Sequence, residues 1–156
     1  TLFPIMLISL VDDLKETNVI IRLFIQLFSA SLMIYYFQIN QNYNSNFEFS
    51  QTNLLIILVS VVLSMWLMNL YNFMDGIDGL VTVHALCMSA GLGLIAVFHP
   101  LALVASDLVM LCAALAACFA PLMWLNWPPA RVFMGDAGAV PLGFFLAFAL
   151  HKIYLY

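Results

Sequence analysis

Long apolar runs constrain this chain more than any other feature of its sequence. Two of them, residues 54–68 and 80–97, contain no Asp, Glu, Lys or Arg. A helix that crosses the hydrocarbon core of a bilayer needs about 20 mostly apolar residues. Hydrophobic residues make up 65% of the 156 residues and charged residues only 8%, whereas a soluble domain has about 45–50% and about 25%. This surplus of apolar surface requires lipid as its solvent, so the sequence predicts an integral membrane protein.

The apolar runs divide the chain into five segments long enough to span a bilayer and a shorter one at its start. Helix-breaking pairs such as His99-Pro100 and a polar stretch at residues 40–53, expected to form a loop, separate them. A lone strand cannot satisfy its backbone in lipid, so the spans are expected to be α-helices. The expected fold class is all-α: one polytopic transmembrane helix bundle of about six helices over residues 1–156. These helices are expected at residues 1–11, 19–39, 53–72, 79–98, 101–125 and 138–156.

Consecutive loops must alternate between the two faces of the membrane. The loops after the first, third and fifth apolar segments therefore share one face, and this face carries Lys15, Arg22 and Arg131, whereas Lys152 lies on the other. Because cytoplasmic loops hold the excess of Lys and Arg, the first face is predicted to be cytoplasmic. The net charge of −4 argues against a nucleic-acid partner, because nucleic acid is bound by a basic surface.

Six of the eight acidic residues fall on that same face, and they are Asp12, Asp13, Glu16, Asp75, Asp78 and Asp136. Carboxylates gathered near hydrocarbon with few bases among them repel one another. A divalent cation is the simplest compensation, and oxygen ligands favour Mg²⁺, Mn²⁺ or Ca²⁺ over zinc. Magnesium is the usual ion where phosphate groups complete the shell, so a metal–phosphate site is expected at this face.

Each polar motif also has a purely structural interpretation. Polar side chains recur every third position from Asn69 to Asp78, which would align them on one helix face, but the glycines among them indicate that the helix opens there. An Asp in this stretch can serve as N-cap of the following helix. Asp12-Asp13 and the turn at residues 135–138 can equally be helix caps. Only the convergence of all three motifs on one face favours a functional site.

Three motifs carry a resemblance to a known family of membrane enzymes. They read VDDLKETNVIIRLFIQ at 11–26, NLYNFMDGIDGL at 69–80 and NWPPARVFMGDAGAVPLGF at 126–144. In this order they resemble the polyprenyl-phosphate N-acetylhexosamine-1-phosphate transferases, of glycosyltransferase 4 type. The wording of residues 72–79 is more similar to the branch that initiates O-antigen and enterobacterial common antigen than to the peptidoglycan branch. Such enzymes have about ten or eleven spans, so the chain is expected to be either a fragment, which lacks N-terminal spans and a C-terminal loop with a His motif, or a degenerate relative.

The resemblance implies a reaction at the membrane surface. An N-acetylhexosamine-1-phosphate would pass from a UDP-sugar to undecaprenyl phosphate with release of UMP, which starts a lipid-linked glycan for lipopolysaccharide or another cell-wall polysaccharide. Mg²⁺, with Mn²⁺ as an alternative, would bridge the diphosphate. The implied location is the bacterial inner membrane, multi-pass, with the site facing the cytoplasm. The resemblance leaves the oligomeric state undecided between a monomer and a homodimer. Residues 1–156 alone are expected to have little or no activity.

The matched positions imply a role for each candidate residue. The catalytic carboxylates would be Asp12, Asp13, Asp75 and Asp78. The metal ligands would be Asp136, Asp13 and Asn72. The nucleotide would contact Asn126, Phe133 and Asp75, with Phe133 stacked on uracil or, alternatively, facing lipid or core. Phosphate would be held by Arg22 and Arg131, since a guanidinium binds phosphate with two parallel hydrogen bonds; Arg131 is equally explained as a marker of the cytoplasmic face.

Three other functions fit the sequence less well. An ion or proton transporter would place its carboxylates near the bilayer midplane, whereas these cluster at one face. A CDP-alcohol phosphotransferase also uses Asp-Gly motifs and Mg²⁺, but residues 80–82 lack the Ala-Arg that its motif needs. A structural subunit would leave the three motifs unexplained. Within the spans, Asp107 is expected to make a hydrogen bond in the bundle interior, and His84 is expected to be buried and hydrogen-bonded.

Overall fold

The computed structural model describes residues 2–15, 17–44, 51–98 and 102–155 of the chain. These ranges form six helices: α1 (Leu2–Leu14), α2 (Val19–Asn44), α3 (Gln51–Met74), α4 (Leu80–Val97), α5 (Ala102–Asn126) and α6 (Asp136–Leu155). Five of them, α2 to α6, are long and apolar enough to cross a membrane. The expected all-α bundle of five spans and one shorter helix is therefore confirmed.

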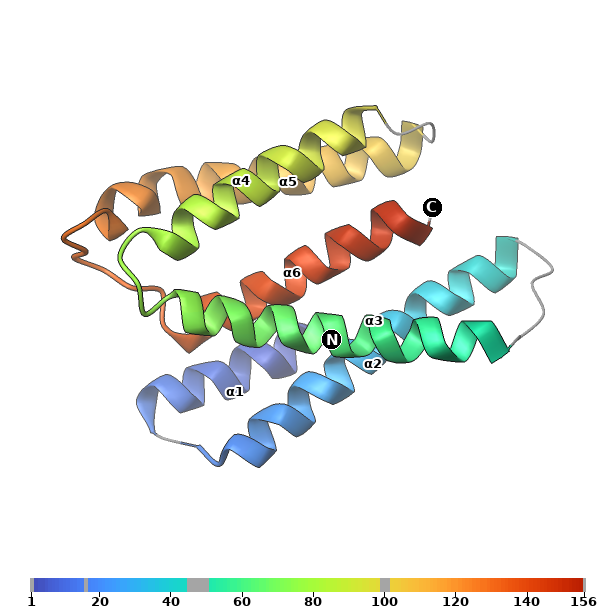
Figure 1. Cartoon of the computed structure of the whole chain (residues 1–156), viewed down its shortest axis with the longest axis horizontal. Helices are drawn as coiled ribbons and strands as arrows, with labels where there is room; N and C mark the ends of the chain where they lie inside the picture. The colour runs from blue at the N-terminus through green and yellow to red at the C-terminus, as the bar shows by residue number, and fades with distance from the viewer. Residues whose placement is uncertain (1, 16, 45–50, 99–101, 156) are drawn as a thin grey trace.

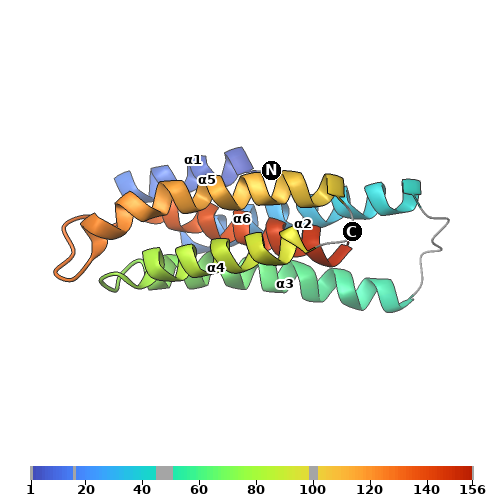
Figure 2. The same ribbon diagram turned by 90° about the horizontal axis from the view of Figure 1, so that it is seen from above.

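The helices lie along one common long axis, and successive helices run in opposite directions along it (Figures 1 and 2). The turn between α3 and α4, the loop between α5 and α6, and the junction of α1 with α2 lie at the same end, on the left in Figure 1. We call this the loop end and define it by residues 12–15, 17–18, 75–79 and 127–136. Its existence confirms that the three polar motifs share one end of the bundle.

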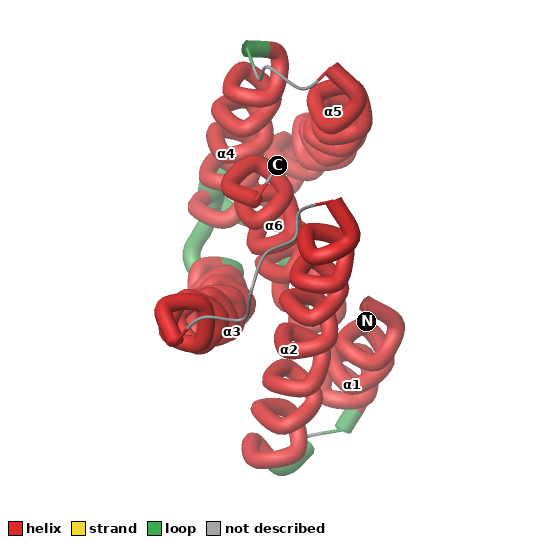
Figure 3. The backbone as a smooth tube through the Cα atoms, turned by 90° about the vertical axis from the view of Figure 1, so that its right-hand side faces the viewer, coloured by secondary structure: helices red, strands yellow, loops and turns green. Residues whose placement is uncertain are grey.

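Helix α6 occupies the middle of the bundle. It lies between the α4–α5 pair on one side and α1, α2 and α3 on the other (Figure 3). Half of its apolar window is buried, against at most 33% in any other span. The first turn of α6 therefore reaches the loop end from the centre of the molecule, where every neighbouring helix can contribute side chains to it.

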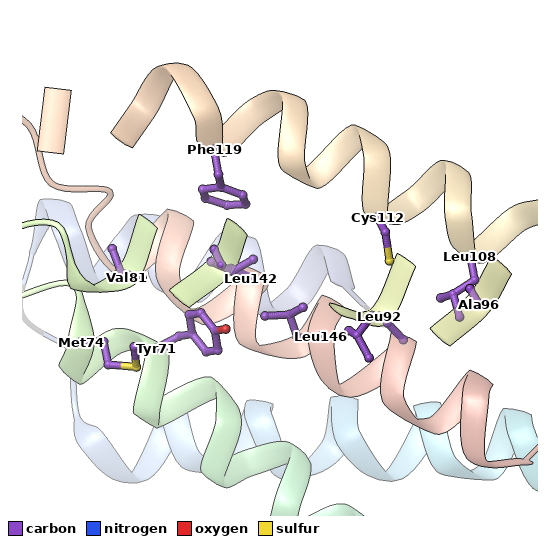
Figure 4. Packing of buried hydrophobic residues seen from close by; sticks show 12 residues of the cluster. Tyr71, Met74, Val81, Leu92, Ala96, Leu108, Cys112, Phe119, Leu142 and Leu146 are labelled. Atoms are coloured by element: carbon purple, nitrogen blue, oxygen red, sulfur yellow. The ribbon is translucent and has the colours of Figure 1, made fainter. Parts of the chain in front are cut away.

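Two apolar clusters hold α6 in place. One joins α3, α4, α5 and α6; in Figure 4, Phe119 and Cys112 of α5 project toward Leu142 and Leu92. The other joins α1, α2, α3 and α6 around residues such as Ile5, Phe37, Met68 and Phe144. At the contact of α3 with α6, a Cβ added at Gly143 would lie 2.6 Å from the Met68 Cα atom. Glycine thus lets two helix backbones approach closely, as is common between membrane helices.

Several helix ends lie beyond the expected boundaries. Helix α1 continues to Leu14, so Asp12 and Asp13 belong to its last turn rather than to a loop. The polar stretch at residues 40–53, expected as a loop, is helical at both ends, since α2 reaches Asn44 and α3 begins at Gln51. Propagating an existing helix adds one hydrogen bond for each residue ordered, so it continues past the apolar segment that hydropathy detects. Helix α6 begins at Asp136, two residues before the expected start.

The structure confirms one of the two expectations for polar residues within the spans and contradicts the other. His84 is half-buried and its Nδ1 lies 2.6 Å from the Tyr71 hydroxyl, so the expected hydrogen bond is confirmed. The expectation for Asp107 was wrong: its side chain is 74% exposed and pairs with Lys152, whose Nζ lies 3.2 Å from its Oδ2. Leu108, the next residue, is the one that faces the core, and a long Lys stem allows its ammonium group to reach an acid at the end of the bundle.

Candidate functional site

Asp13 binds the beginning of α6. Its Oδ1 accepts a hydrogen bond from the backbone N–H of Asp136 at 2.9 Å, and its Oδ2 accepts one from the N–H of Ala137 at 2.9 Å. The first N–H groups of a helix have no partner within the helix, and the positive end of the helix dipole favours a carboxylate there. Asp13 is therefore the cap of α6, supplied by the last turn of α1.

Asp75 binds the turn that precedes α6. It directly follows α3, it is 6% exposed, and its two oxygens accept hydrogen bonds from the N–H groups of Met134 and Gly135 at 3.1 and 2.8 Å. Gly135 has a φ of +68°, and a Cβ added there would lie 2.9 Å from Asp13 Oδ2. Only glycine adopts this conformation readily and leaves room for the neighbouring carboxylate. Asp75 and Asp13 thus bind consecutive amides of residues 134–137.

Asp78 and Asn126 join the α3–α4 turn to the α5–α6 loop. Asp78 Oδ2 accepts a hydrogen bond from the Ala130 N–H at 3.0 Å. Asn126 is 1% exposed; its Oδ1 accepts from the Gly79 N–H at 3.0 Å and its Nδ2 donates to the Val132 carbonyl at 2.9 Å. The alternative that an Asp caps α4 was wrong, because the N-cap is Gly79, which has no side-chain cap bond.

Asp12 and Asp136 meet at a single guanidinium group. Arg22, in the first turn of α2, bonds Asp12 Oδ2, and its Nη1 lies 3.0 Å from Asp136 Oδ2. Asp12 Oδ1 accepts hydrogen bonds from the hydroxyl of Thr17 at 2.5 Å and from its N–H at 2.8 Å. The bonds from Thr17, supported by Arg22, hold the pKa of Asp12 below its usual range, although partial burial opposes them. Asp12 is therefore a carboxylate at neutral pH.

The charges at this point do not balance. Two carboxylates share one guanidinium, and all three side chains are partly accessible, between 11% and 24% exposed. No group of three His, Cys, Asp or Glu side chains converges as a metal site within residues 2–15, 17–44, 51–98 and 102–155. Magnesium, however, is usually held by one or two carboxylates together with substrate phosphates and water. Asp12 and Asp136 supply two carboxylates, which is the kind and number of protein ligands that such a magnesium site needs.

The other candidates named from the sequence are Asn72, Phe133, Arg131 and Glu16. Asn72 is half-buried on the last turn of α3, and its side chain makes no hydrogen bond within the described part of the chain. Phe133 is 46% exposed and Arg131 is also exposed. Glu16, expected among the acids of this face, lies outside the described residues.

Sequence reasoning missed Thr17, which binds Asp12 through both its hydroxyl and its amide. A Thr five residues after an Asp is a weak signal by itself, because the bond forms only when the chain turns between α1 and α2. Gln26 was also not among the expected residues; it is 3% exposed and accepts a hydrogen bond from Asn69 Nδ2 at 2.7 Å. Gln26 follows Arg22 by one helical turn, and this spacing along α2 could have pointed to it.

The fold and the site together define a class of protein: a polytopic helical membrane protein whose loops gather acidic side chains around the N-terminus of its central helix. The model of a known family, glycosyl transferase family 4, matches residues 1–153. The chain belongs to this family, and the resemblance of its three motifs is thereby confirmed at family level.

Two curated relatives carry the name phospho-N-acetylmuramoyl-pentapeptide-transferase. The protein from Helicobacter hepaticus is 30% identical over 151 residues, which cover 80% of this chain and 42% of the relative. The protein from Acinetobacter baylyi is 35% identical over 86 residues, which cover 48% of this chain and 23% of the relative. The chain thus spans less than half the length of these relatives.

Proposed function

We propose that the protein containing this chain transfers an N-acetylhexosamine-1-phosphate from a UDP-sugar to undecaprenyl phosphate and releases UMP. The observation that carries the proposal is the meeting of Asp12 and Asp136 at Arg22, beside the N-terminus of α6. Both substrates are anions, and a helix N-terminus is a favourable place for phosphate. The loop end is also where a lipid phosphate and a soluble nucleotide can meet, because the spans end there.

Asp136 and Asp12 are proposed to hold a Mg²⁺ ion, with Mn²⁺ as an alternative, and Asn72 and Asp13 to be further ligands. When bound, the ion would neutralise the negative charge of the diphosphate. Asp13 retains acceptor capacity beyond its two bonds to the backbone, since a carboxylate offers about four lone-pair sites. This arrangement would place the metal next to the first turn of α6.

The other residues of the site are proposed to orient the reacting groups. Arg22 would hold a substrate phosphate, because its guanidinium has five N–H donors in a planar fork. Asp75 and Asp78 would keep the α5–α6 loop in position through the bonds they accept from its amides. Phe133 presents a partly exposed ring on which uracil could stack. Asn126 is buried, and both its Oδ1 and its Nδ2 are hydrogen-bonded within the protein. Support of the loop is therefore the role we propose for it, and a direct contact with nucleotide stays a prediction.

The proposal also concerns which sugar is transferred and which glycan it starts. The residues NFMDGIDG at 72–79 favour an enzyme that initiates O-antigen or a related cell-envelope polysaccharide. A second candidate is transfer of phospho-N-acetylmuramoyl-pentapeptide, and it is favoured by the name of the two relatives from Helicobacter hepaticus and Acinetobacter baylyi. The two candidates differ in the UDP-sugar that would be consumed, so one panel of substrates separates them.

The test is UMP release by the full-length protein in lipid vesicles that contain undecaprenyl phosphate. The panel contains several UDP-N-acetylhexosamines and the UDP-N-acetylmuramoyl-pentapeptide, each with Mg²⁺ or with EDTA. We expect release from one sugar class, its loss in EDTA, and a decrease of at least about 100-fold in Asp136→Asn. The matched control is Asp107→Asn, which removes an exposed acid at the opposite end. Wild-type rates in Asp136→Asn, or no release from any donor, would contradict the proposal.

We also propose that the loop end faces the cytoplasm of a bacterial inner membrane. Lys15, Arg22 and Arg131 lie at this end or on the first turn beside it, whereas Lys152 lies near the other, and cytoplasmic loops hold the excess of Lys and Arg. In a background without the native cysteines, we expect a membrane-impermeant thiol reagent applied to intact spheroplasts to label Val97→Cys and to spare Lys15→Cys. The reverse pattern would place the site on the other side of the membrane.

A further inference from the structure

A groove lies at the loop end, between the last two turns of α5 and the loop that follows it. It has a volume of about 480 Å³, and apart from Arg131 its lining is apolar, including Met123, Trp124, Trp127 and Pro128. None of the acids that bind the turn before α6 lines it. Figure 2 shows this part of α5 and its loop at the edge of the bundle. The groove is therefore separate from the site formed by Asp12, Arg22 and Asp136.

The position of the groove relative to the membrane follows from its two Trp side chains. The apolar span of α5 covers Ser106–Asn126, so Trp124 and Trp127 lie where this span ends. Their side chains are 83% and 55% exposed, which is a large apolar surface to leave in water. Trp is enriched at the level of the lipid head groups, where its ring meets apolar chains and its N–H meets water. The groove is thus placed at the membrane–water interface.

Arg131 gives the groove its charge. Two of the bases in the described part of the chain are paired, Arg22 with Asp12 and Asp136 and Lys152 with Asp107. The exposed side chain of Arg131 has no hydrogen bond or ion pair within the described residues, and only its backbone N–H is bonded, to the Leu125 carbonyl. An unpaired guanidinium beside exposed aromatic rings is complementary to a molecule with an anionic head and an apolar body.

We propose that this groove binds an anionic phospholipid of the surrounding bilayer, with its phosphate at Arg131 and an acyl chain against Trp124 and Trp127. One basic residue near a membrane surface favours an anionic lipid only about fivefold, so the apolar contacts must supply the rest of the affinity. A free phosphate lacks these contacts. A phospholipid is already present at this depth.

The experiment measures lipid adducts of the delipidated full-length protein by native mass spectrometry, with phosphatidylglycerol and phosphatidylcholine of identical acyl chains. We expect more phosphatidylglycerol than phosphatidylcholine adducts, and a decrease of this ratio by about fivefold in Arg131→Gln. Arg131→Lys keeps the charge and should keep most of the preference. The matched control is Lys15→Gln, which removes the other unpaired base of the loop end and should leave the ratio unchanged. The double variant Trp124→Ala, Trp127→Ala should weaken binding of both lipids.

Three results would overturn the proposal. The first is an unchanged ratio in Arg131→Gln, and the second is an equal decrease in Lys15→Gln, which would mean general attraction to the loop end. The third is loss of the preference when inorganic phosphate or the UDP-sugar is added at constant ionic strength. This result would assign Arg131 to a soluble phosphate, which is one of the two roles that the family resemblance left open for it. Adduct counting needs no turnover, so this result is independent of the transferase assay. If Arg131→Gln proves unfolded by circular dichroism, Arg131→Lys and the Trp double variant decide.

Discussion

Asp136 donates its backbone N–H to Asp13 across 123 positions of sequence, with 2.9 Å between the nitrogen and Oδ1. The last turn of α1 thereby holds the first turn of α6. This bond has a consequence for function, because Asp136 is also the residue whose carboxylate reaches Arg22. The position of the proposed metal ligand is therefore set by a helix that lies at the other end of the chain.

Removal of this cap is expected to destabilise the protein. In Asp13→Ala the N–H groups of Asp136 and Ala137 lose their acceptors, and loss of a helix cap costs about 1 kcal/mol, up to about 2. Denaturation in detergent, followed by circular dichroism, measures the change. Asp107→Asn serves as the control and should change stability by less than about 0.5 kcal/mol. Equal stability of Asp13→Ala and wild type would show that water replaces the carboxylate without cost.

Two glycine-to-alanine variants should shift stability in opposite directions. Gly135→Ala forces a side chain into a φ of +68° and toward Asp13, and the left-handed conformation alone costs an L-residue about 1–2 kcal/mol. Gly91, inside α4, has nothing within 4 Å of an added Cβ, so Gly91→Ala should gain up to about 1 kcal/mol in helix propensity. Midpoints of denaturation of the two variants, measured side by side, check this difference. A stabilised Gly135→Ala would refute the described turn.

The close approach of α3 and α6 gives a third prediction. A Cβ at position 143 would lie 2.6 Å from Met68 Cα, and a helix backbone cannot turn aside as a side chain can. Gly143→Ala is expected to cost about 1–3 kcal/mol through overpacking and to reduce UMP release, since Asp75 at the end of α3 would shift from the turn that it binds. Gly93→Ala is the control, because its added Cβ would meet Cys112 Cβ at an ordinary 3.4 Å.

The lowered pKa of Asp12 predicts a pH window for stability. The carboxyl titrates near 3.8 when unfolded, and the bonds from Thr17 and Arg22 lower its pKa in the folded protein. Between these two values the unfolded state binds more protons, so stability falls as the pH falls. The contribution of Asp12 is fully present above the unfolded pKa and is lost as the pH falls through the folded one.

We therefore expect Asp12→Asn to be less stable than wild type by a constant amount from about pH 8 to about pH 5, and the difference to shrink below about pH 4. Denaturation of both proteins across this range measures it. Burial and the neighbouring Asp12 raise the pKa of Asp136, so Asp136→Asn and the double variant are measured beside Asp12→Asn. A difference that changes between pH 6 and 8 also in the background of Asp136→Asn would mean that Asp12 itself titrates near neutrality, contrary to the bonds it makes with Thr17.

Much of the architecture followed from local sequence properties. The run of uncharged residues from 80 to 97 was expected to span the membrane, and α4 covers Leu80–Val97. Counting spans also placed Asp12, Asp78 and Asp136 at one end of the bundle, because a chain that crosses a membrane must alternate between its faces. Hydropathy was less informative at the polar ends of helices, where it did not detect the continuation of α2 to Asn44.

Which oxygen binds which group was decided only by the tertiary structure. Asp12 and Asp13 are adjacent, yet one binds Arg22 and Thr17 while the other binds the amides of α6. Motif and composition cannot distinguish two neighbouring carboxylates, because Asp12 and Asp13 have the same charge and nearly the same sequence distance from every other residue of the site. Their separation arises from the direction that each side chain takes from the last turn of α1, and from how closely α6 is packed beside it. Packing of helices distant in sequence sets that geometry, and no local pattern encodes it.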